Sequence, residues 1–152
     1  MIERFLDLPA ARVRVLEREG GPGRTVIFLH GITSSASTWA PFLETLPEGV
    51  RGIAYDGLGS GYTERHGARR PITRSDQRGL LLDVADALDA EQFEIVAHSM
   101  GCGPALGAAW RHPDRVRGLL LISPATQGRR KLGPTLRMAR FGPTARLMEL
   151  AA

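Results

Sequence analysis

One serine of this chain lies in a sequence context that suits a nucleophile. Ser99 stands in the run Ala-His-Ser-Met-Gly over 97–101, between an apolar strand-length segment, 93–97, and a helix-length segment, 104–111. A serine in a tight turn from strand to helix has its hydroxyl pushed out of the sheet, and small residues two positions before and after it let the backbones pack closely. The backbone N–H of Met100 then points to where an oxyanion would develop. By itself, such a short pattern more often marks a buried serine in a structural turn. Whether Ser99 is a nucleophile therefore depends on the other motifs of the chain.

Two further loops with glycine follow apolar strand-length segments. The segment 26–29 ends in His30-Gly31-Ile32, and a strand that breaks into a glycine turn presents a free backbone N–H, here that of Ile32. The segment 53–55 ends in Asp56, which opens a glycine-rich loop whose aspartate can cap its own turn. Since ligands and chemistry gather at the carboxyl ends of parallel strands, these loops and the Ser99 turn are expected at one edge of a sheet.

The order and spacing of these three motifs resemble the α/β-hydrolase family, over about residues 4–124. The resemblance implies that Ser99 is the catalytic nucleophile and that the backbone N–H groups of Ile32 and Met100 form the oxyanion hole. It also implies that His30 and Gly31 are the supporting pair of the oxyanion loop. Asp56 matches a structural aspartate. The first small residue of the serine turn, usually glycine in the family, is here Ala97.

The rest of a catalytic triad is not visible in the chain. In this family the acid and then the histidine follow the serine, after further strands. The segment 116–122 is followed by Ser-Pro-Ala-Thr, and the only later acid is Glu149. His112, the only histidine after Ser99, lies at the end of the next helix, too close in the chain to fold back. Without a base the serine hydroxyl keeps its ordinary reactivity, so we expect a fragment of a longer serine hydrolase. The alternative is a non-catalytic pseudo-hydrolase, a remnant that binds a ligand or a partner.

The family resemblance leaves the reaction itself open. Serine at the elbow argues against the haloalkane dehalogenase and epoxide hydrolase relatives, which carry aspartate there. An esterase or lipase-like hydrolase of an ester-like or other hydrophobic acyl substrate is the first expectation. Acyltransferase, carbon–carbon bond hydrolase and cofactor-free haloperoxidase activities stay open, because a fold alone does not determine a reaction.

The elements that must position these residues follow from the hydrophobic patterns. Segment 12–19 alternates polar and apolar residues like a half-buried strand, and 3–8 can pair with it. Short continuous apolar runs, typical of strands covered on both faces, alternate with helix-like segments. The expected strands are 25–29, 51–55, 93–97 and 116–122, and the expected helices are 37–46, 73–88 and 104–111.

This alternation predicts the α/β class: a mostly parallel α/β-hydrolase sheet with helices on both faces, truncated after the strand that follows the nucleophile elbow. At 152 residues the core forms one domain. Residues 1–128 are expected to form the N-terminal part of the hydrolase core and 129–152 the beginning of a helical cap or lid. The apolar residues of that cap segment suggest a hydrophobic small-molecule substrate, although plain packing of a helix on the core is the favoured explanation for them: Leu132, Leu136, Met138, Phe141 and Leu147. The last strand, with Leu119 to Ile122, would be an uncovered edge through which copies could associate.

Composition excludes several other classes. The net charge of +4 comes almost entirely from arginine spread along the chain, with Lys131 the only lysine, and no set of aromatic residues is interleaved for stacking on bases. We therefore expect no nucleic-acid binding. No run of about 18 apolar residues predicts a membrane span, and the N-terminus lacks a signal-peptide pattern. With Cys102 as the single cysteine, a reducing, cytoplasmic location is expected.

Neither a metal nor an organic cofactor is expected. The sequence holds no cysteine pair, no His-x-x-x-His and no acidic cluster with the spacing of metal ligands. The glycine-rich loop over 57–61 superficially resembles a phosphate-binding loop. It lacks the Gly-Lys-Ser/Thr that would follow in such a loop, and no helix opens directly on it.

Overall fold

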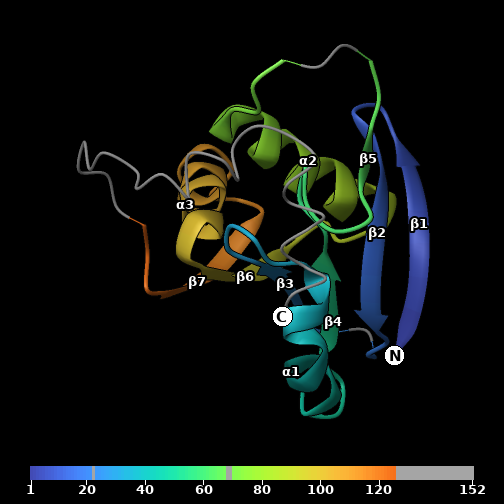
Figure 1. The fold of residues 1–152 in the computed structure, drawn as a ribbon. Helices are drawn as coiled ribbons and strands as arrows, with labels where there is room; N and C mark the ends of the chain where they lie inside the picture. Colours follow the sequence, from blue (N-terminus) through green and yellow to red (C-terminus); the bar gives the residue numbers. More distant parts are fainter. Residues whose placement is uncertain (22, 68–69, 126–152) are drawn as a thin grey trace.

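The computed structural model describes residues 1–21, 23–67 and 70–125 (Figure 1). The predicted cap segment, 129–152, and the end of the predicted core, 126–128, lie outside these residues. The described elements follow the order of the sequence: β1 (Ile2–Leu8), β2 (Ala11–Arg18), β3 (Thr25–Leu29), the 3₁₀ turn η1 (Ala36–Trp39), α1 (Ala40–Glu44), β4 (Arg51–Tyr55), β5 (Glu64–Arg65), α2 (Arg74–Ala87), β6 (Phe93–His98), the 3₁₀ turn η2 (Ser99–Gly101), α3 (Cys102–Arg111) and β7 (Val116–Ile122).

The strands form one mixed sheet in the order β1-β2-β4-β3-β6-β7, with the short β5 beside β2. The strands β4, β3, β6 and β7 run parallel to one another, whereas β1 and β2 form an antiparallel hairpin that joins the sheet through β4. Parallel neighbours need crossover connections, and here helices provide them. The predicted mostly parallel sheet with an antiparallel beginning is confirmed.

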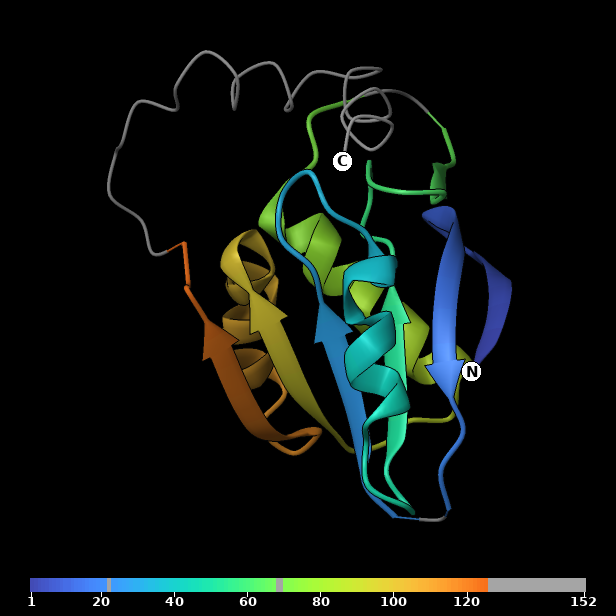
Figure 2. The ribbon, with the colours of Figure 1, turned by 60° about the horizontal axis from the view of Figure 1, so that its bottom comes forward.

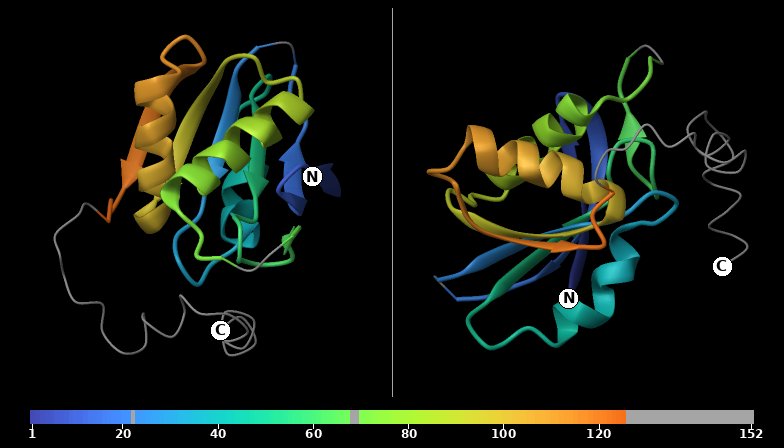
Figure 3. Two further views of the ribbon diagram at one scale, coloured as in Figure 1. Left: turned by 90° about the horizontal axis from the view of Figure 1, so that it is seen from above. Right: turned by 90° about the vertical axis from the view of Figure 1, so that its left-hand side faces the viewer.

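Helices cover both faces of the sheet (Figures 2 and 3). The helices α2 and α3 pack side by side on one face, while η1 and α1 lie on the other face, over β3 and β4. The larger buried cluster lies under α2 and α3 and includes Ile27, Ile53 and Ile95 of three neighbouring strands. A smaller cluster around Phe28 and Trp39 lies under α1. Two buried faces explain why the central strands have continuous apolar sequences.

The helix beginnings agree with the local signals in the sequence. Thr73 caps α2 in a capping box: its hydroxyl accepts from the Asp76 amide, and the Asp76 carboxylate accepts from the Thr73 amide. Pro41 lies in the first turn of α1, where its missing N–H costs nothing. Helix α3 begins at Cys102, two residues earlier than predicted, because Pro104 is also tolerated within the first turn.

Two local predictions differ from the structure. The helix predicted over 37–46 is divided into η1 and the five-residue α1. Strand β5 was not predicted, since Glu64 and Arg65 carry no strand-like pattern and pair with β2 only through their backbone. Among the helices of the described residues, none combines the length and the apolarity needed to cross a membrane.

Candidate active site

The three sequence motifs meet at one edge of the sheet. Strands β3, β4 and β6 are parallel neighbours, so the residues that follow them leave the sheet at the same, carboxyl edge. Gly31 comes shortly after β3, Asp56 directly after β4 and Ser99 directly after β6. Figure 2 shows these three strands ending at the same edge of the sheet. This is the edge at which open α/β sheets bind ligands.

Ser99 lies in a sharp turn with unusual backbone geometry. Its φ angle of 49° is in the left-handed region, which residues with a side chain adopt only when their surroundings impose it. The turn η2 begins at Ser99 and continues without a break into α3. The serine therefore stands at the N-terminal end of a helical segment, where the helix dipole favours a developing negative charge. This is the strand–turn–helix context that the elbow motif requires.

Two glycines allow the neighbouring backbones to come close to the elbow. A Cβ on Gly101 would lie 2.7 Å from the His30 carbonyl oxygen and 2.9 Å from the Leu29 carbonyl oxygen. A Cβ on Gly31 would lie 3.2 Å from Cβ of Ser99. The loop after β3 and the turn after β6 are therefore in direct contact, as the prediction of a shared oxyanion site requires.

His30 joins the loop after β3 to the loop after β4. Its ring is buried; Nδ1 lies 2.7 Å from the Gly31 carbonyl oxygen, and the Gly57 amide donates to Nε2 over 3.0 Å. Since Nε2 accepts, Nδ1 carries the proton and the ring is neutral. Burial lowers the pKa of His30, against the opposite effects of the Gly31 carbonyl and the Asp56 charge. Both ring nitrogens are thus engaged in holding loops, which agrees with a supporting role.

Asp56 is a fully buried structural carboxylate. Its Oδ1 accepts from the Ala36 amide over 2.6 Å, and its Oδ2 accepts from the Tyr62 amide over 2.8 Å. It therefore connects the beginning of η1 with the far end of its own glycine-rich loop. Nothing in these contacts directs the carboxylate to Ser99, which agrees with the structural role that the family resemblance implies.

The two predicted oxyanion donors, Ile32 and Met100, each adjoin a residue of the contact between the two loops. Met100 follows the serine within η2, and Ile32 follows Gly31, whose position touches the serine side chain. Among the hydrogen bonds of the described residues, none is donated by the Ile32 amide. The assignment of these two amides as oxyanion donors stays a prediction.

The described residues place no general base at Ser99. Within 1–21, 23–67 and 70–125 the Ser99 hydroxyl makes no side-chain hydrogen bond. His66 is exposed in a loop, and His112 forms the C-terminal cap of α3, the end away from the elbow. In the same part of the chain, no three His, Cys, Asp or Glu side chains are grouped as metal ligands.

Sequence reasoning missed one residue that organises this region, Arg14 of β2. Its side chain is only 8% exposed and lies 3.7 Å from the Asp56 carboxylate. In the sequence Arg14 shares its alternation phase with Arg12, which stays exposed, so no local signal distinguished the two arginines.

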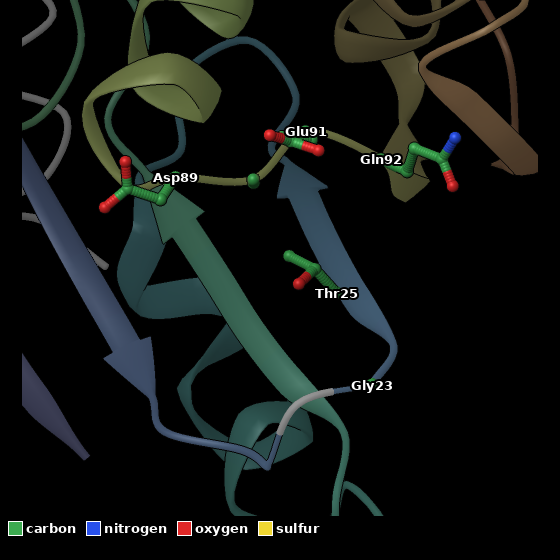
Figure 4. A pocket seen from close by; sticks show the side chains of 6 residues that line it. Gly23, Thr25, Asp89, Glu91 and Gln92 are labelled. Carbon is green, nitrogen blue, oxygen red and sulfur yellow. The ribbon is translucent and has the colours of Figure 1, made fainter.

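A pocket outside the site lies at the opposite edge of the sheet (Figure 4). It is formed by the beginning of β3 and by the turn between α2 and β6: Gly23, Thr25, Asp89, Ala90, Glu91 and Gln92. Because it lies at the amino ends of the strands, it is separated from Ser99 by the length of the sheet.

Comparison with known proteins agrees with this geometry. The model of the α/β-hydrolase fold family matches residues 24–144. The chain belongs to the α/β-hydrolase fold family. It is 36% identical over 126 residues to 2-hydroxymuconate semialdehyde hydrolase of Pseudomonas sp. strain CF600, a match that covers 78% of this chain and 43% of that protein. It is 32% identical over 112 residues to epoxide hydrolase B of Mycobacterium tuberculosis, covering 73% of this chain and 32% of that protein.

Solved α/β-hydrolase structures have the same arrangement of elements. A Vigna radiata epoxide hydrolase mutant superimposes with a TM-score of 0.71 at 29% identity, over 79% of this chain and 37% of that one. A probable hydrolytic enzyme from Pseudomonas aeruginosa PAO1 superimposes with a TM-score of 0.73 at 24% identity, over 81% and 41% of the two chains, which shows the fold alone. This chain thus spans less than half the length of these relatives.

Proposed function

We propose that Ser99 is the nucleophile of a serine hydrolase that acts on an ester-like or other hydrophobic acyl substrate. The observation that carries the proposal is the backbone of Ser99, held at a φ of 49° between β6 and α3 with the Gly31 loop against its Cβ. A strained, half-buried turn serine beside a second glycine loop is the arrangement that presents a hydroxyl to a carbonyl carbon. The amides of Ile32 and Met100 are the proposed donors to the oxyanion.

The proposed reaction makes separate demands on the site. The Ser99 oxygen bonds to the substrate carbonyl carbon, the carbonyl oxygen becomes an oxyanion between the two amides, and the serine proton must pass to a base. None of the described histidines is hydrogen-bonded to Ser99, and the sequence has no histidine after His112, so the proposal assigns the role of the base to no residue of this chain. Enzymes of this kind that lose their triad keep roughly 10³-fold acceleration over water from the oxyanion hole and binding.

The substrate class rests on the serine itself. In the resemblance, the epoxide hydrolase branch carries aspartate at the elbow, so Ser99 favours substrates attacked at an acyl carbon. The similarity to a protein named as a semialdehyde hydrolase supports hydrolysis without determining this chain's substrate. Carbon–carbon bond hydrolysis stays the second candidate within the same nucleophile chemistry.

Covalent labelling tests the proposal. The purified 152-residue chain is incubated with a fluorophosphonate and with p-nitrophenyl esters, alongside Ser99→Ala. Ser123→Ala is the matched control, because Ser123 also follows a parallel strand, is exposed and has a positive φ of 46°. Labelling that disappears in Ser99→Ala and persists in Ser123→Ala supports the proposal. A folded wild-type chain without labelling contradicts an enzymatic role for this chain and favours the pseudo-hydrolase alternative.

We also propose that copies of this chain can associate through β7. In the described sheet β7 pairs only with β6, and Leu119, Leu120 and Ile122 are exposed. An apolar edge strand with unpaired backbone groups is a template for pairing with another strand. The same surface would serve the partner-binding alternative.

A further inference from the structure

We propose that Arg14 is a positioning residue for the oxyanion side of the Ser99 site, an inference that rests on the proposed hydrolase function. Arg14 lies in the middle of β2, far in the sequence from all three site motifs. Its guanidinium is enclosed by groups from four segments: the Glu3 carboxylate, the Ser37 hydroxyl, the Asp56 carboxylate and the Tyr62 ring.

Arg14 contributes a positive charge next to Asp56. The Asp56 carboxylate is fully buried, and a buried charge is costly unless it is paired and hydrogen-bonded. Nη1 of Arg14 lies 3.7 Å from its Oδ2. Arg14 therefore places a positive charge beside this buried carboxylate, whose two oxygens accept from the backbone amides of Ala36 and Tyr62.

Arg14 and Asp56 also hold η1, which follows the oxyanion loop along the chain. Nη1 of Arg14 donates to the Ser37 hydroxyl over 3.0 Å, and Asp56 accepts from the Ala36 amide over 2.6 Å. The two charged side chains thus hold consecutive residues of η1. This anchors the C-terminal end of the loop that carries Ile32.

Arg14 holds the glycine-rich loop as well. Its guanidinium carbon lies 5.0 Å from the centre of the Tyr62 ring, and its backbone N–H donates to the Thr63 hydroxyl over 3.3 Å. Its carbonyl accepts from the Asp56 amide over 3.0 Å. Through the bond from Gly57 to His30, this loop supports the N-terminal end of the oxyanion loop. Arg14 therefore acts on both ends of the loop that presents the Ile32 amide.

The elbow itself does not depend on Arg14. Among the described residues, the contacts at Ser99 come from Gly31, from the helix that follows and from the Ala125 amide, which donates to the Ser99 carbonyl over 3.2 Å. Removing the guanidinium should therefore displace the Ile32 donor while leaving the serine and the Met100 amide in place. Loss of one oxyanion donor costs roughly 10²- to 10³-fold in rate, so a displaced donor should cost about tenfold.

The test compares Arg14→Met, Arg14→Lys and Glu3→Gln in the full chain. Glu3 binds the outer side of the Arg14 guanidinium and is half exposed, so Glu3→Gln leaves the contacts with Ser37, Asp56 and Tyr62 in place and is the matched control. The first readout is amide hydrogen exchange at Ala36 and Tyr62, which requires no catalysis. The second readout is the rate of fluorophosphonate labelling at Ser99, with kcat and KM measured separately wherever ester turnover is detected.

In Arg14→Met we expect faster exchange at Ala36 and Tyr62, unchanged exchange in α2, and labelling slowed about tenfold with KM little changed. Arg14→Lys keeps a cation but not the forked set of donors, so it should show a smaller change in the same direction. Uniformly faster exchange, including α2, would indicate a merely structural role and overturn the proposal.

Two other outcomes are separated by the same design. The positioning role is overturned if exchange at Ala36 and Tyr62 in Arg14→Lys equals that of the wild type, and the same holds for Arg14→Met if that variant folds. This conclusion does not depend on the labelling result. A wild-type chain that is not labelled contradicts the proposed function, which this inference requires, while the exchange data still show whether Arg14 holds the two loops.

Discussion

At the scale of single residues, the packing around Gly101 leaves no room for a side chain next to the Ser99 turn. The carbonyl oxygens of His30 and Leu29 occupy the place that a Cβ would take, and both belong to backbone that cannot turn away as a flexible side chain can. The close approach places the oxyanion loop against the serine turn. A glycine is therefore needed at position 101 so that the ends of β3 and β6 can pack against each other.

Gly101→Ala is expected to lower the free energy of unfolding by about 1–3 kcal/mol and to slow labelling of Ser99. Urea unfolding and fluorophosphonate labelling measure the two effects. Gly79→Ala in α2 is the matched control: a Cβ there meets nothing within 4 Å, and alanine should stabilise the helix by about 0.5–1 kcal/mol. Equal stability of Gly101→Ala and the wild type would contradict the close packing.

His30 predicts a pH dependence of stability. Since burial lowers its pKa in the folded state, the unfolded chain binds the proton more readily. The contribution of neutral His30 is therefore complete above the unfolded pKa of about 6.5 and is lost as the pH falls through the lower folded value. Urea unfolding between pH 8 and pH 5 should show this loss in the wild type and a flatter profile in His30→Gln. The exposed His66→Gln is the control for removing a histidine, and a profile in His30→Gln as steep as the wild type would contradict the assignment.

At the scale of elements, the beginning of α2 is stabilised by a local device. Thr73 and Asp76 satisfy each other's backbone amides, and Arg70 forms an ion pair with the Asp76 carboxylate. The Arg70 hydrogen bond, followed by the bond from the Thr73 amide, lowers the pKa of Asp76 well below its usual range. The helix α2, whose buried residues belong to the larger core cluster, is thus anchored by residues close to its start.

Thr73→Ala should lower the free energy of unfolding by about 1 kcal/mol, because an unsatisfied N-terminal amide replaces the cap. Chemical unfolding monitored by circular dichroism measures it. Ser75→Ala changes an exposed hydroxyl of the same turn, which contacts only Arg78, and should stay within about 0.5 kcal/mol of the wild type. Similar losses in both variants would argue against a specific cap.

At the scale of the whole molecule, the sheet has two unlike ends. On one side the sheet ends with the antiparallel strand β1, whose Glu3 forms an ion pair with Arg14 of β2. On the other side β7 presents Leu120 at 57% exposure, and among the described residues its outer backbone edge pairs with no strand. The second end has the character of an association surface.

Leu120→Lys should therefore reduce self-association of the chain. Sedimentation velocity over a concentration series is expected to show association in the wild type and a shift towards the monomer in Leu120→Lys, since a charge on an edge strand opposes pairing. Leu106→Lys, an equally polar change at an exposed leucine of α3, should behave like the wild type. A wild-type chain that stays monomeric throughout, or a Leu120→Lys variant that associates equally, contradicts association through β7.

The sequence by itself determined the secondary-structure elements and turns, because these depend on residues that are close together in the chain. The apolar runs, the Thr73 cap and the glycine turns predicted the strands β3, β4, β6 and β7 within about one residue, and with them the family and the carboxyl edge that bears Ser99. These signals are local, because periodicity, capping and turn geometry depend on residues a few positions apart.

Only the tertiary structure decided which distant residues support that edge. Arg14 and Arg12 are equivalent in the alternation of β2, yet the antiparallel register that pairs Val15 with Tyr55 brings Arg14, and not Arg12, over the buried Asp56. The pairing of Asp56 with the Ala36 amide likewise depends on β3 and β4 being neighbours in the sheet. Such contacts arise from strand order and register, which no short stretch of sequence specifies.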